Sequence, residues 1–178
     1  MEEKILQYEN PAEEKVLRAK TKPFSFSPKG DPIMGSHVFS RGEFSKLILT
    51  MRKMMKRANG VGLSANQVGF SYRMFVAQVP NASGEQKFYT ILNPELTKDG
   101  KGKVAQEEGC LSVVGIWGTV ERPDRITLCG FDRNGKPVKI KAWGLLARVF
   151  QHEVDHLDGK LFIDRAKNLQ KVDDFIQE

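Results

Sequence analysis

The stretch Gln151–Gly159, QHEVDHLDG, contains two histidines four residues apart, with a glutamate directly after the first. It closes a longer run, GLLARVFQHEVDHLDG, in which no helix-breaking residue interrupts residues 145–158. The apolar and histidine positions recur at three- and four-residue spacing, which is typical of one face of a helix. The run therefore predicts a largely buried helix that ends near Gly159 and carries on one face Leu145, Val149, His152 and His156.

The two histidines of this helix suit a metal ion. Positions i and i+4 of a helix lie about 5 to 6 Å apart, so His152 and His156 can direct ring nitrogens at one ion, with Glu153 beside it. A catalytic metal commonly has three protein ligands and one open position. A third ligand must then come from elsewhere in the chain. Without one, the pair would be two histidines buried in a core.

The third ligand is sought among the remaining histidine, the two cysteines and the acidic residues after the helix, of which Asp164, Asp173, Asp174 and Glu178 have no persuasive context. The HExxH zinc proteases place a third histidine where this chain has Phe162, and His37 lies in a Pro-, Gly- and Ser-rich stretch, which favours the surface. Cys129 lies within the strand-like run ITLCGFD and is expected to be a small buried hydrophobic residue. Cys110, in QEEGCLSVVG, follows a glycine, so we expect an irregular backbone that can aim its thiol. Beside the histidine pair, we favour Cys110 as a ligand over a purely structural cysteine.

The composition indicates one globular domain, residues 1–178, in a reducing compartment. With 178 residues, 40% of them hydrophobic, the chain is long enough to bury a core. No long apolar run or basic N-terminal segment indicates a membrane span or an export signal. Two cysteines are too few for a disulfide scaffold, so we expect a cytoplasmic protein. The net charge of +6 is scattered, and its one dense cluster, MRKMMKR at residues 51–57, is interpreted as a solvated helix face rather than a nucleic-acid site.

The remaining elements are predicted from periodicity and turn residues. Residues 22–42 are rich in Pro, Gly and Ser and are interpreted as a long loop. A helix follows, with Ser40 and Glu43 as a capping box and Asn59–Gly60 at its end. Four β-rich runs, RMFVAQV, KFYTILN, DRITLCGFD and KPVKIKAW, are predicted strands. The last two flank Asn134–Gly135, which favours a type I′ hairpin turn, and the tail AKNLQKVDDFIQE is expected to form a helical turn or two.

Three segments together resemble the signature motifs of the peptide deformylase family, metal hydrolases that remove the formyl group from nascent N-formylmethionyl chains. They are, in order, GVGLSANQVG at residues 60–69, EEGCLSVVG at residues 107–115 and QHEVDHLDG at residues 151–159. The resemblance extends from about Ile5 to Asp164. It implies an α+β fold in which antiparallel β-sheets pack around a central HExxH helix.

The resemblance also implies a metal site and its chemistry. The ligands that it assigns are Cys110, His152 and His156. They would hold one divalent ion per chain, typically Fe²⁺, with Zn²⁺ or Ni²⁺ able to replace it; a His₂Cys set by itself suits several first-row ions. Glu153 would act as general base on water. The donors to the developing oxyanion would be the side-chain amide of Gln67 and the backbone N–H of Leu111.

Further residues are assigned around this site. Gly62 would contact the substrate backbone, and we expect Val149 to form a wall of an apolar pocket for the methionine side chain. Glu108 would pair with Arg122 and hold the loop of the cysteine ligand. Trp117 either lines the rim of the substrate site or packs as an ordinary aromatic side chain. The partners implied are nascent formyl-Met peptides at the ribosome, with no membrane contact.

The first motif departs from the family pattern at Ser64 and Asn66, where alanine and proline are common. The change leaves Gln67 in place and leaves the conformation of this loop open. Two other functions also stay open at this point. A metallopeptidase that cuts internal bonds is disfavoured by the missing third histidine, and a non-catalytic member that binds formylated peptides is disfavoured by the intact set of site residues.

Overall fold

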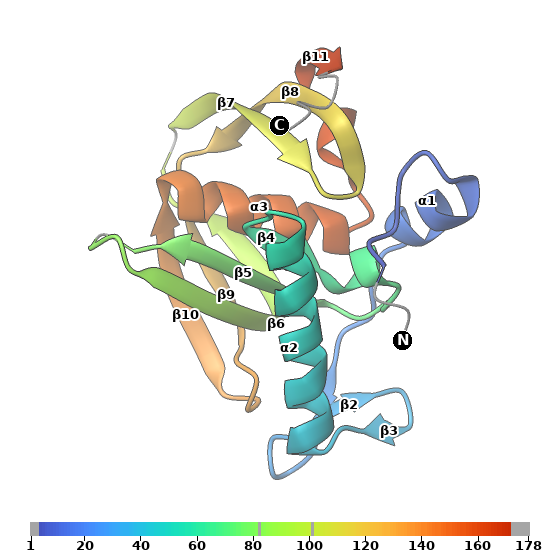
Figure 1. The fold of residues 1–178 in the computed structure, drawn as a ribbon. Coiled ribbons are helices and arrows are strands. Elements are labelled where there is room, and N and C mark those ends of the chain that lie inside the picture. Colours follow the sequence, from blue (N-terminus) through green and yellow to red (C-terminus); the bar gives the residue numbers. More distant parts are fainter. Residues whose placement is uncertain (1–3, 82, 101, 172–178) are drawn as a thin grey trace.

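The structure is a computed structural model that describes residues 4–81, 83–100 and 102–171, and it combines helices with antiparallel sheets (Figure 1). The helices are α1 (Pro11–Leu17), α2 (Arg41–Arg57) and α3 (Gly144–Leu157), with the 3₁₀ turns η1 (Ala65–Val68) and η2 (Phe162–Asp164). The strands are β1 (Ser25–Phe26), β2 (Pro32–Met34), β3 (His37–Val38), β4 (Gly62–Ser64), β5 (Met74–Pro80), β6 (Gln86–Lys98), β7 (Lys103–Cys110), β8 (Val113–Pro123), β9 (Arg125–Phe131), β10 (Pro137–Trp143) and β11 (Lys167–Lys171). They form three sheets with the orders β1-β2-β3, β10-β9-β6-β5-β4 and β11-β8-β7. This mixture confirms the α+β class.

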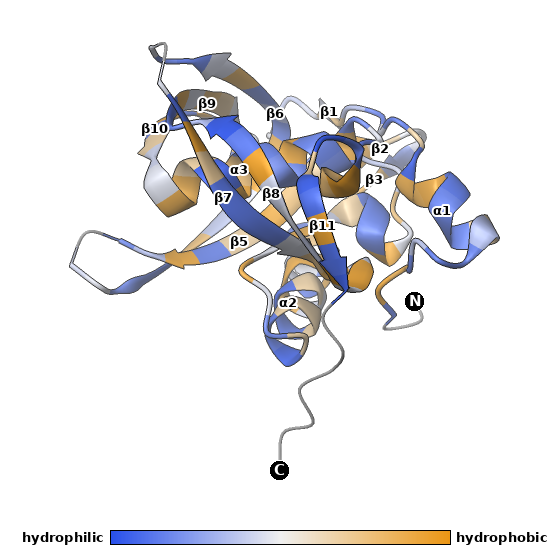
Figure 2. Cartoon of the chain, turned by 90° about the horizontal axis from the view of Figure 1, so that it is seen from above, coloured by the Kyte–Doolittle hydropathy of each residue, from blue (hydrophilic) through white to orange (hydrophobic). Residues whose placement is uncertain are grey.

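Helix α3, which carries the two histidines, runs between the five-stranded sheet and the β7–β8 hairpin (Figure 1). Viewed from above, β7 lies across α3 and is mostly hydrophilic in colour (Figure 2). The apolar side of α3 joins one core with the large sheet, whose members include Val149, Phe150, Val154, Leu157, Phe75, Ile91, Ile126 and Leu128. Each such side chain contributes about 1.5 to 3 kcal/mol when buried, so this contact fixes the position of the helix. The predicted end is confirmed, because Gly159 follows the helix with φ of 73°.

Helix α2 matches its predicted signals. Ser40 is the N-cap and forms the capping box with Glu43, and the helix ends at Arg57 just before Asn59. Its apolar stripe, which includes Met51 and Met55, is fully buried against the large sheet. The chain then passes directly into β4, so the end of α2 leads to the first of the three sequence motifs.

The hairpin between β9 and β10 is confirmed, but its type I′ turn is not. Only Gly135 has positive φ, at 71°, whereas Asn134 does not. The N–H of Gly135 donates to the carbonyl of Asp132 at 3.0 Å, and the carboxylate of Asp132 accepts from the N–H groups of Asn134 and Lys136 at 2.8 and 2.9 Å. The connection of five residues between the strands, 132–136, satisfies these donors with one left-handed glycine and needs no left-handed asparagine.

The segment 22–42 is not a featureless loop, because it holds the small sheet β1-β2-β3. The turn between β1 and β2 lies against the β9–β10 hairpin, and there Gly30 and Gly135 meet backbone to backbone. A Cβ on Gly30 would collide with the carbonyl of Asn134, and one on Gly135 would collide with the carbonyl of Gly30. The two glycines therefore join segments about 100 residues apart by a contact that leaves no room for a side chain.

Two other expectations were wrong. Residues 167–171 form strand β11 beside β8 rather than a helical turn, while residues 172–178 of that tail lie outside the described residues. Cys129 is exposed rather than buried, since it lies on β9 opposite the polar residues Glu95 and Lys139. No helix in the described part of the chain has the length and apolar character needed to cross a membrane.

Candidate active site

Three potential ligand atoms converge between α3 and the end of β7. The Sγ atom of Cys110 lies 3.1 Å from Nε2 of His156, which lies 3.2 Å from Nε2 of His152. All three atoms lie within 4.8 Å of one another. Cys110 reaches this point because the β7–β8 pairing shifts register between Glu108 and Cys110, and such a bulge redirects a side chain. The arrangement brings together the three residues that the sequence predicted as ligands.

The side chains around His152 stabilise positive charge on or beside its imidazole ring. Its Nδ1 lies 3.0 Å from a carboxylate oxygen of Glu108, which leaves Nε2 directed at the other two ligand atoms. Burial alone would lower the pKa of this ring, yet hydrogen bonds with Cys110 and Glu108 raise the pKa to about 10. Burial lowers the pKa of His156 well below its ordinary value. Once their protons are released, Cys110 offers a thiolate and the two histidines offer imidazole nitrogens, which are donors that divalent first-row cations prefer. A carboxylate behind His152 orients that ring, so these residues fit a metal ion.

Glu108 is the centre of a buried ion-pair network. Arg122 donates to both of its carboxylate oxygens, at 2.6 and 2.9 Å, and Arg148 donates to one of them at 2.6 Å. Arg122 is 2% exposed and also donates to Asp155 at 2.7 Å. Burial would raise the pKa of Glu108, but the hydrogen bonds from Arg122 and His152 outweigh it and hold this pKa well below its usual value. The family resemblance indicated the pair with Arg122, whereas Arg148 and Asp155 were missed.

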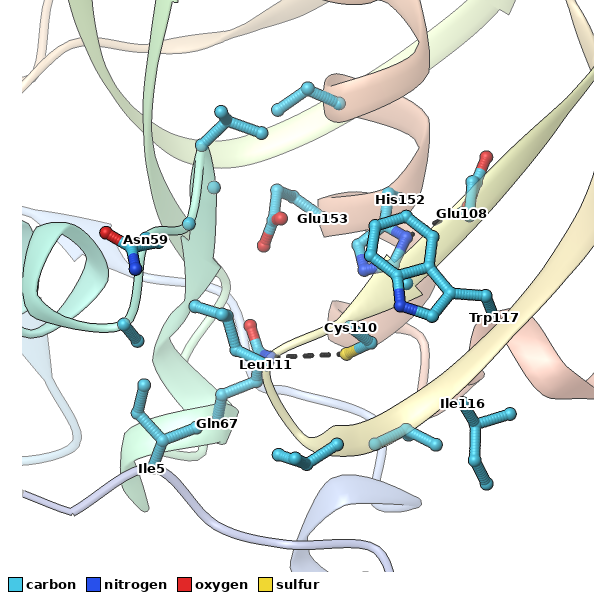
Figure 3. A pocket seen from close by; sticks show the side chains of 18 of the residues that line it. Ile5, Asn59, Gln67, Glu108, Cys110, Leu111, Ile116, Trp117, His152 and Glu153 are labelled. Carbon is cyan, nitrogen blue, oxygen red and sulfur yellow. Dashed lines mark hydrogen bonds and ion pairs between the residues drawn. The ribbon is translucent and has the colours of Figure 1, made fainter. Parts of the chain in front are cut away.

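Glu153 points its carboxylate into the space between α3 and β4 (Figure 3). The side chain is buried, and one carboxylate oxygen, Oε2, accepts a hydrogen bond from the hydroxyl of Ser64 at 2.5 Å. The other oxygen faces Gly62, where an added Cβ would collide with it. Burial raises the pKa of the Glu153 carboxyl. The glycine predicted to contact substrate thus also makes room for this glutamate.

Gln67 lies in the 3₁₀ turn η1 and is buried. Its Oε1 accepts from the N–H of Ser64 at 2.9 Å, which turns the amide nitrogen toward Ser112 Oγ at 3.0 Å and toward Cys110 Sγ at 3.7 Å. Figure 3 shows this side chain and Leu111 next to Cys110.

Asn66, the neighbouring departure from the family pattern, is buried and secures η1 to the HExxH helix. Its side-chain amide donates to the carbonyl of His156 at 2.7 Å and, more weakly, to that of Leu17 at 3.3 Å. The turn that presents Gln67 is thereby fixed to the helix that carries the histidines.

A pocket of about 740 Å³ opens beside these residues (Figure 3). Gly62, Gln67, Cys110, His152 and Glu153 all line it. Its apolar wall includes Leu111, Val149 and Trp117, and at its rim Trp117 is half exposed. Of the two readings for Trp117, the rim position is the one that the structure has. His37 lies elsewhere, on the surface beside Glu43.

Comparisons with known proteins agree on one family. The family model described as polypeptide deformylase matches residues 2–172. The peptide deformylase of Thermodesulfovibrio yellowstonii is 45% identical over 130 residues, which is 73% of this chain and 78% of that protein. The peptide deformylase of Halothermothrix orenii is 45% identical over 141 residues, or 77% and 89% of the two chains. Among solved structures, the peptide deformylase of Thermotoga maritima has a TM-score of 0.75 and 35% identity, over 92% of this chain and 97% of that one.

Proposed function

Since the chain belongs to the peptide deformylase family, whose members hydrolyse the N-terminal formyl group of N-formylmethionyl polypeptides, we propose that Cys110, His152 and His156 hold the divalent ion of this reaction. The supporting observation is the convergence of one sulfur and two imidazole nitrogens within 4.8 Å of one another, at the wall of a pocket. Glu108 would fix the ring of His152 through Nδ1, which is how a carboxylate commonly orients a histidine ligand.

Glu153 is the residue that we assign to proton transfer. The ion supplies Lewis acidity when it is bound. Glu153 would take a proton from the attacking water and later pass it to the leaving amine. Its buried position supports this role, because burial raises the pKa of the carboxyl and so makes the carboxylate a stronger base.

Two donors are assigned to the formyl oxygen, which gains negative charge during attack. They are the side-chain amide of Gln67 and the backbone N–H of Leu111. The contact from Ser64 N–H to Gln67 Oε1 supports the first assignment, since it turns the NH₂ end of the amide toward the ligand atoms. A donor held in place before the reaction stabilises developing charge without reorganising.

The pocket beside the site is assigned to the methionine side chain of the substrate. Val149 forms part of its apolar wall, and Gly62 would contact the substrate backbone. The pocket volume of about 740 Å³ exceeds the needs of one side chain, so residues after methionine would extend toward the rim at Trp117. Helix α3 would act as the centre of a single domain, with the large sheet on one side and the β7–β8 hairpin on the other.

Ferrous iron is the ion that we propose, with Zn²⁺ or Ni²⁺ able to occupy the same donors. We place the protein in the cytoplasm, where nascent formyl-Met chains leave the ribosome. Metal analysis of protein purified without oxygen should give about one iron per chain, because one set of three ligands holds one ion. A preparation that contains zinc alone and is fully active would contradict the choice of iron.

The assignment of Glu153 is tested with formyl-Met-Ala-Ser as substrate and released formate as the readout. Glu153→Ala should lower kcat on the order of 10² to 10⁴ while the ion stays bound, because general-base catalysis contributes that much. Glu95→Ala, which removes an exposed glutamate on β6, is the matched control and should leave kcat unchanged. A Glu153→Ala protein with near-normal kcat, or one without metal, would refute the assigned role.

A further inference from the structure

We infer that the hydroxyl of Ser64 is a positioning group that holds the carboxylate of Glu153 in its working orientation. The Ser64 Oγ atom lies 2.5 Å from Oε2 of Glu153. Such a short separation is typical of a hydroxyl that donates to an ionised carboxylate, and these bonds are about twice as strong as neutral ones. Both side chains are buried, at 0% and 3% exposure, so water does not compete for this contact.

The carboxylate has few other constraints. In the described part of the chain, Ser64 is the side chain that donates to Glu153, and no second hydrogen-bond donor reaches this carboxylate. The remaining oxygen, Oε1, faces the Cα of Gly62 and the pocket. One oxygen is therefore held while the other is left available to water, which is the arrangement that a proton-transfer group needs.

Ser64 also has a fixed backbone from which to act. It ends strand β4, where it pairs with Phe75 of β5, and its N–H donates to Gln67 Oε1 at 2.9 Å. The N–H of one residue thus orients the proposed oxyanion donor, and its hydroxyl orients the proposed base. Replacing the serine by alanine removes the contacts of the hydroxyl and leaves the contact from the N–H to Gln67 in place.

A purely structural role for Ser64 would work through a different contact. Its Oγ also lies 3.1 Å from the backbone carbonyl of Glu153, so the hydroxyl could simply anchor α3. A hydroxyl carries one proton, however, and the ionised acceptor at 2.5 Å is both closer and more strongly accepting than the carbonyl. We therefore assign the proton of Ser64 to the carboxylate.

The inference is tested by Ser64→Ala with formyl-Met-Ala-Ser. Losing a hydrogen bond to a charged group should lower kcat on the order of ten- to a hundredfold, with KM and metal content unchanged. Thr21→Val is the matched control, because Thr21 is a buried hydroxyl that anchors the same helix through the carbonyl of Leu157 at 2.8 Å. This control should keep kcat within about twofold, as expected for a site not coupled to the reacting groups. A crystal structure of Ser64→Ala should show the Glu153 carboxylate in more than one orientation.

The decisive experiment repeats Ser64→Ala in a Glu153→Ala background. Because the inference rests on the role proposed for Glu153, the serine should have nothing left to position, and the second substitution should change kcat by less than about twofold. A loss of the same size in both backgrounds would overturn the inference while leaving the role of Glu153 intact. Near-normal kcat in Glu153→Ala alone would refute that role itself. If Ser64→Ala does not fold, Ser64→Cys, which keeps the volume but donates weakly, takes its place in the same cycle.

Discussion

The two cysteines of this chain have contrasting surroundings, and this contrast tests the metal site at the scale of single residues. Cys110 lies 3.1 Å from His156 Nε2, whereas Cys129 is exposed on β9 among polar neighbours. Cys110→Ala should therefore lose the ion, while Cys129→Ala should keep it. Metal content of the desalted proteins is the measurement. A Cys110→Ala protein with full metal occupancy would show that the third ligand lies elsewhere.

Sequence reasoning could place His152, Glu153 and His156 because helical spacing fixes where they lie relative to one another. Gln67 and Leu111 were indicated only by the family resemblance. Ser64 and Arg148 were missed, for different reasons. Nothing in a short polar loop such as Ser64–Gln67 indicates that it folds back onto a helix about 90 residues away. Arg148, by contrast, gave a usable signal, since it precedes His152 by one turn and a buried helix face that contains an arginine requires a partner.

Arg148 belongs to the scale of elements, because it ties α3 to both strands of the β7–β8 hairpin. Its guanidinium donates to Glu108 at 2.6 Å, to the carbonyl of Val120 at 3.1 Å and to that of Val104 at 2.8 Å. Arg148→Met should lower the free energy of unfolding by about 2 to 4 kcal/mol, because it removes one charged partner from a buried network of ion pairs and hydrogen bonds. Urea unfolding measures this change.

The matched control for this prediction is Arg125→Met, which removes an exposed arginine from β9. It should change the free energy of unfolding by less than about 0.5 kcal/mol, as surface substitutions usually do. Metal content should stay normal in both variants, because Glu108 still contacts His152 Nδ1. A loss in Arg148→Met no larger than in the control would mean that Arg122 alone holds the network together.

Elements with a long periodic pattern were predicted well, and short ones were not. Helices α2 and α3 each repeat their apolar spacing over several turns, so the helical period can be recognised in the sequence. Strands β1 and β3 have two residues each, too few for any alternation to appear. The turn after β9 failed for another reason: Asp132 supplies a side-chain acceptor, and this favours a longer loop than the Asn134–Gly135 dipeptide alone suggests.

At the scale of the whole molecule, the pocket predicts which substrates are accepted. Its apolar wall beside the site should bind a methionine side chain and reject a charged one. The rate constant kcat/KM for formyl-Met-Ala-Ser should exceed that for formyl-Asp-Ala-Ser on the order of 10² or more, because a carboxylate would lose its hydration there. Formate release measures both.

Acetyl-Met-Ala-Ser provides the control at the reacting carbon, since its extra methyl group crowds that carbon while the methionine is retained. It should react much more slowly than the formyl peptide, and unblocked Met-Ala-Ser should stay intact. Cleavage of an internal peptide bond in any of these substrates would favour the metallopeptidase instead. Comparable rates for the methionine and aspartate peptides would mean that the apolar wall does not receive the first side chain.

The arrangement of the sheets is the part of the fold that local patterns could not predict. Strand β6 pairs with β9 although about 30 residues separate them, and β4 touches α3 from about 90 residues away. Such pairings depend on which surfaces meet in three dimensions, so only the resemblance carried by the three motifs indicated them.

Because of the backbone contact between Gly30 and Gly135, the two loops that contain them must change together during evolution. Trimming one partner cannot make room for a side chain on the other, because glycine is already the smallest residue. A deep mutational scan should find both positions intolerant of substitution. A chimera that receives residues 22–42 from a relative should fold well only when the 132–136 turn is taken from the same parent, so recombination between these loops would be selected against even though neither touches the reacting groups.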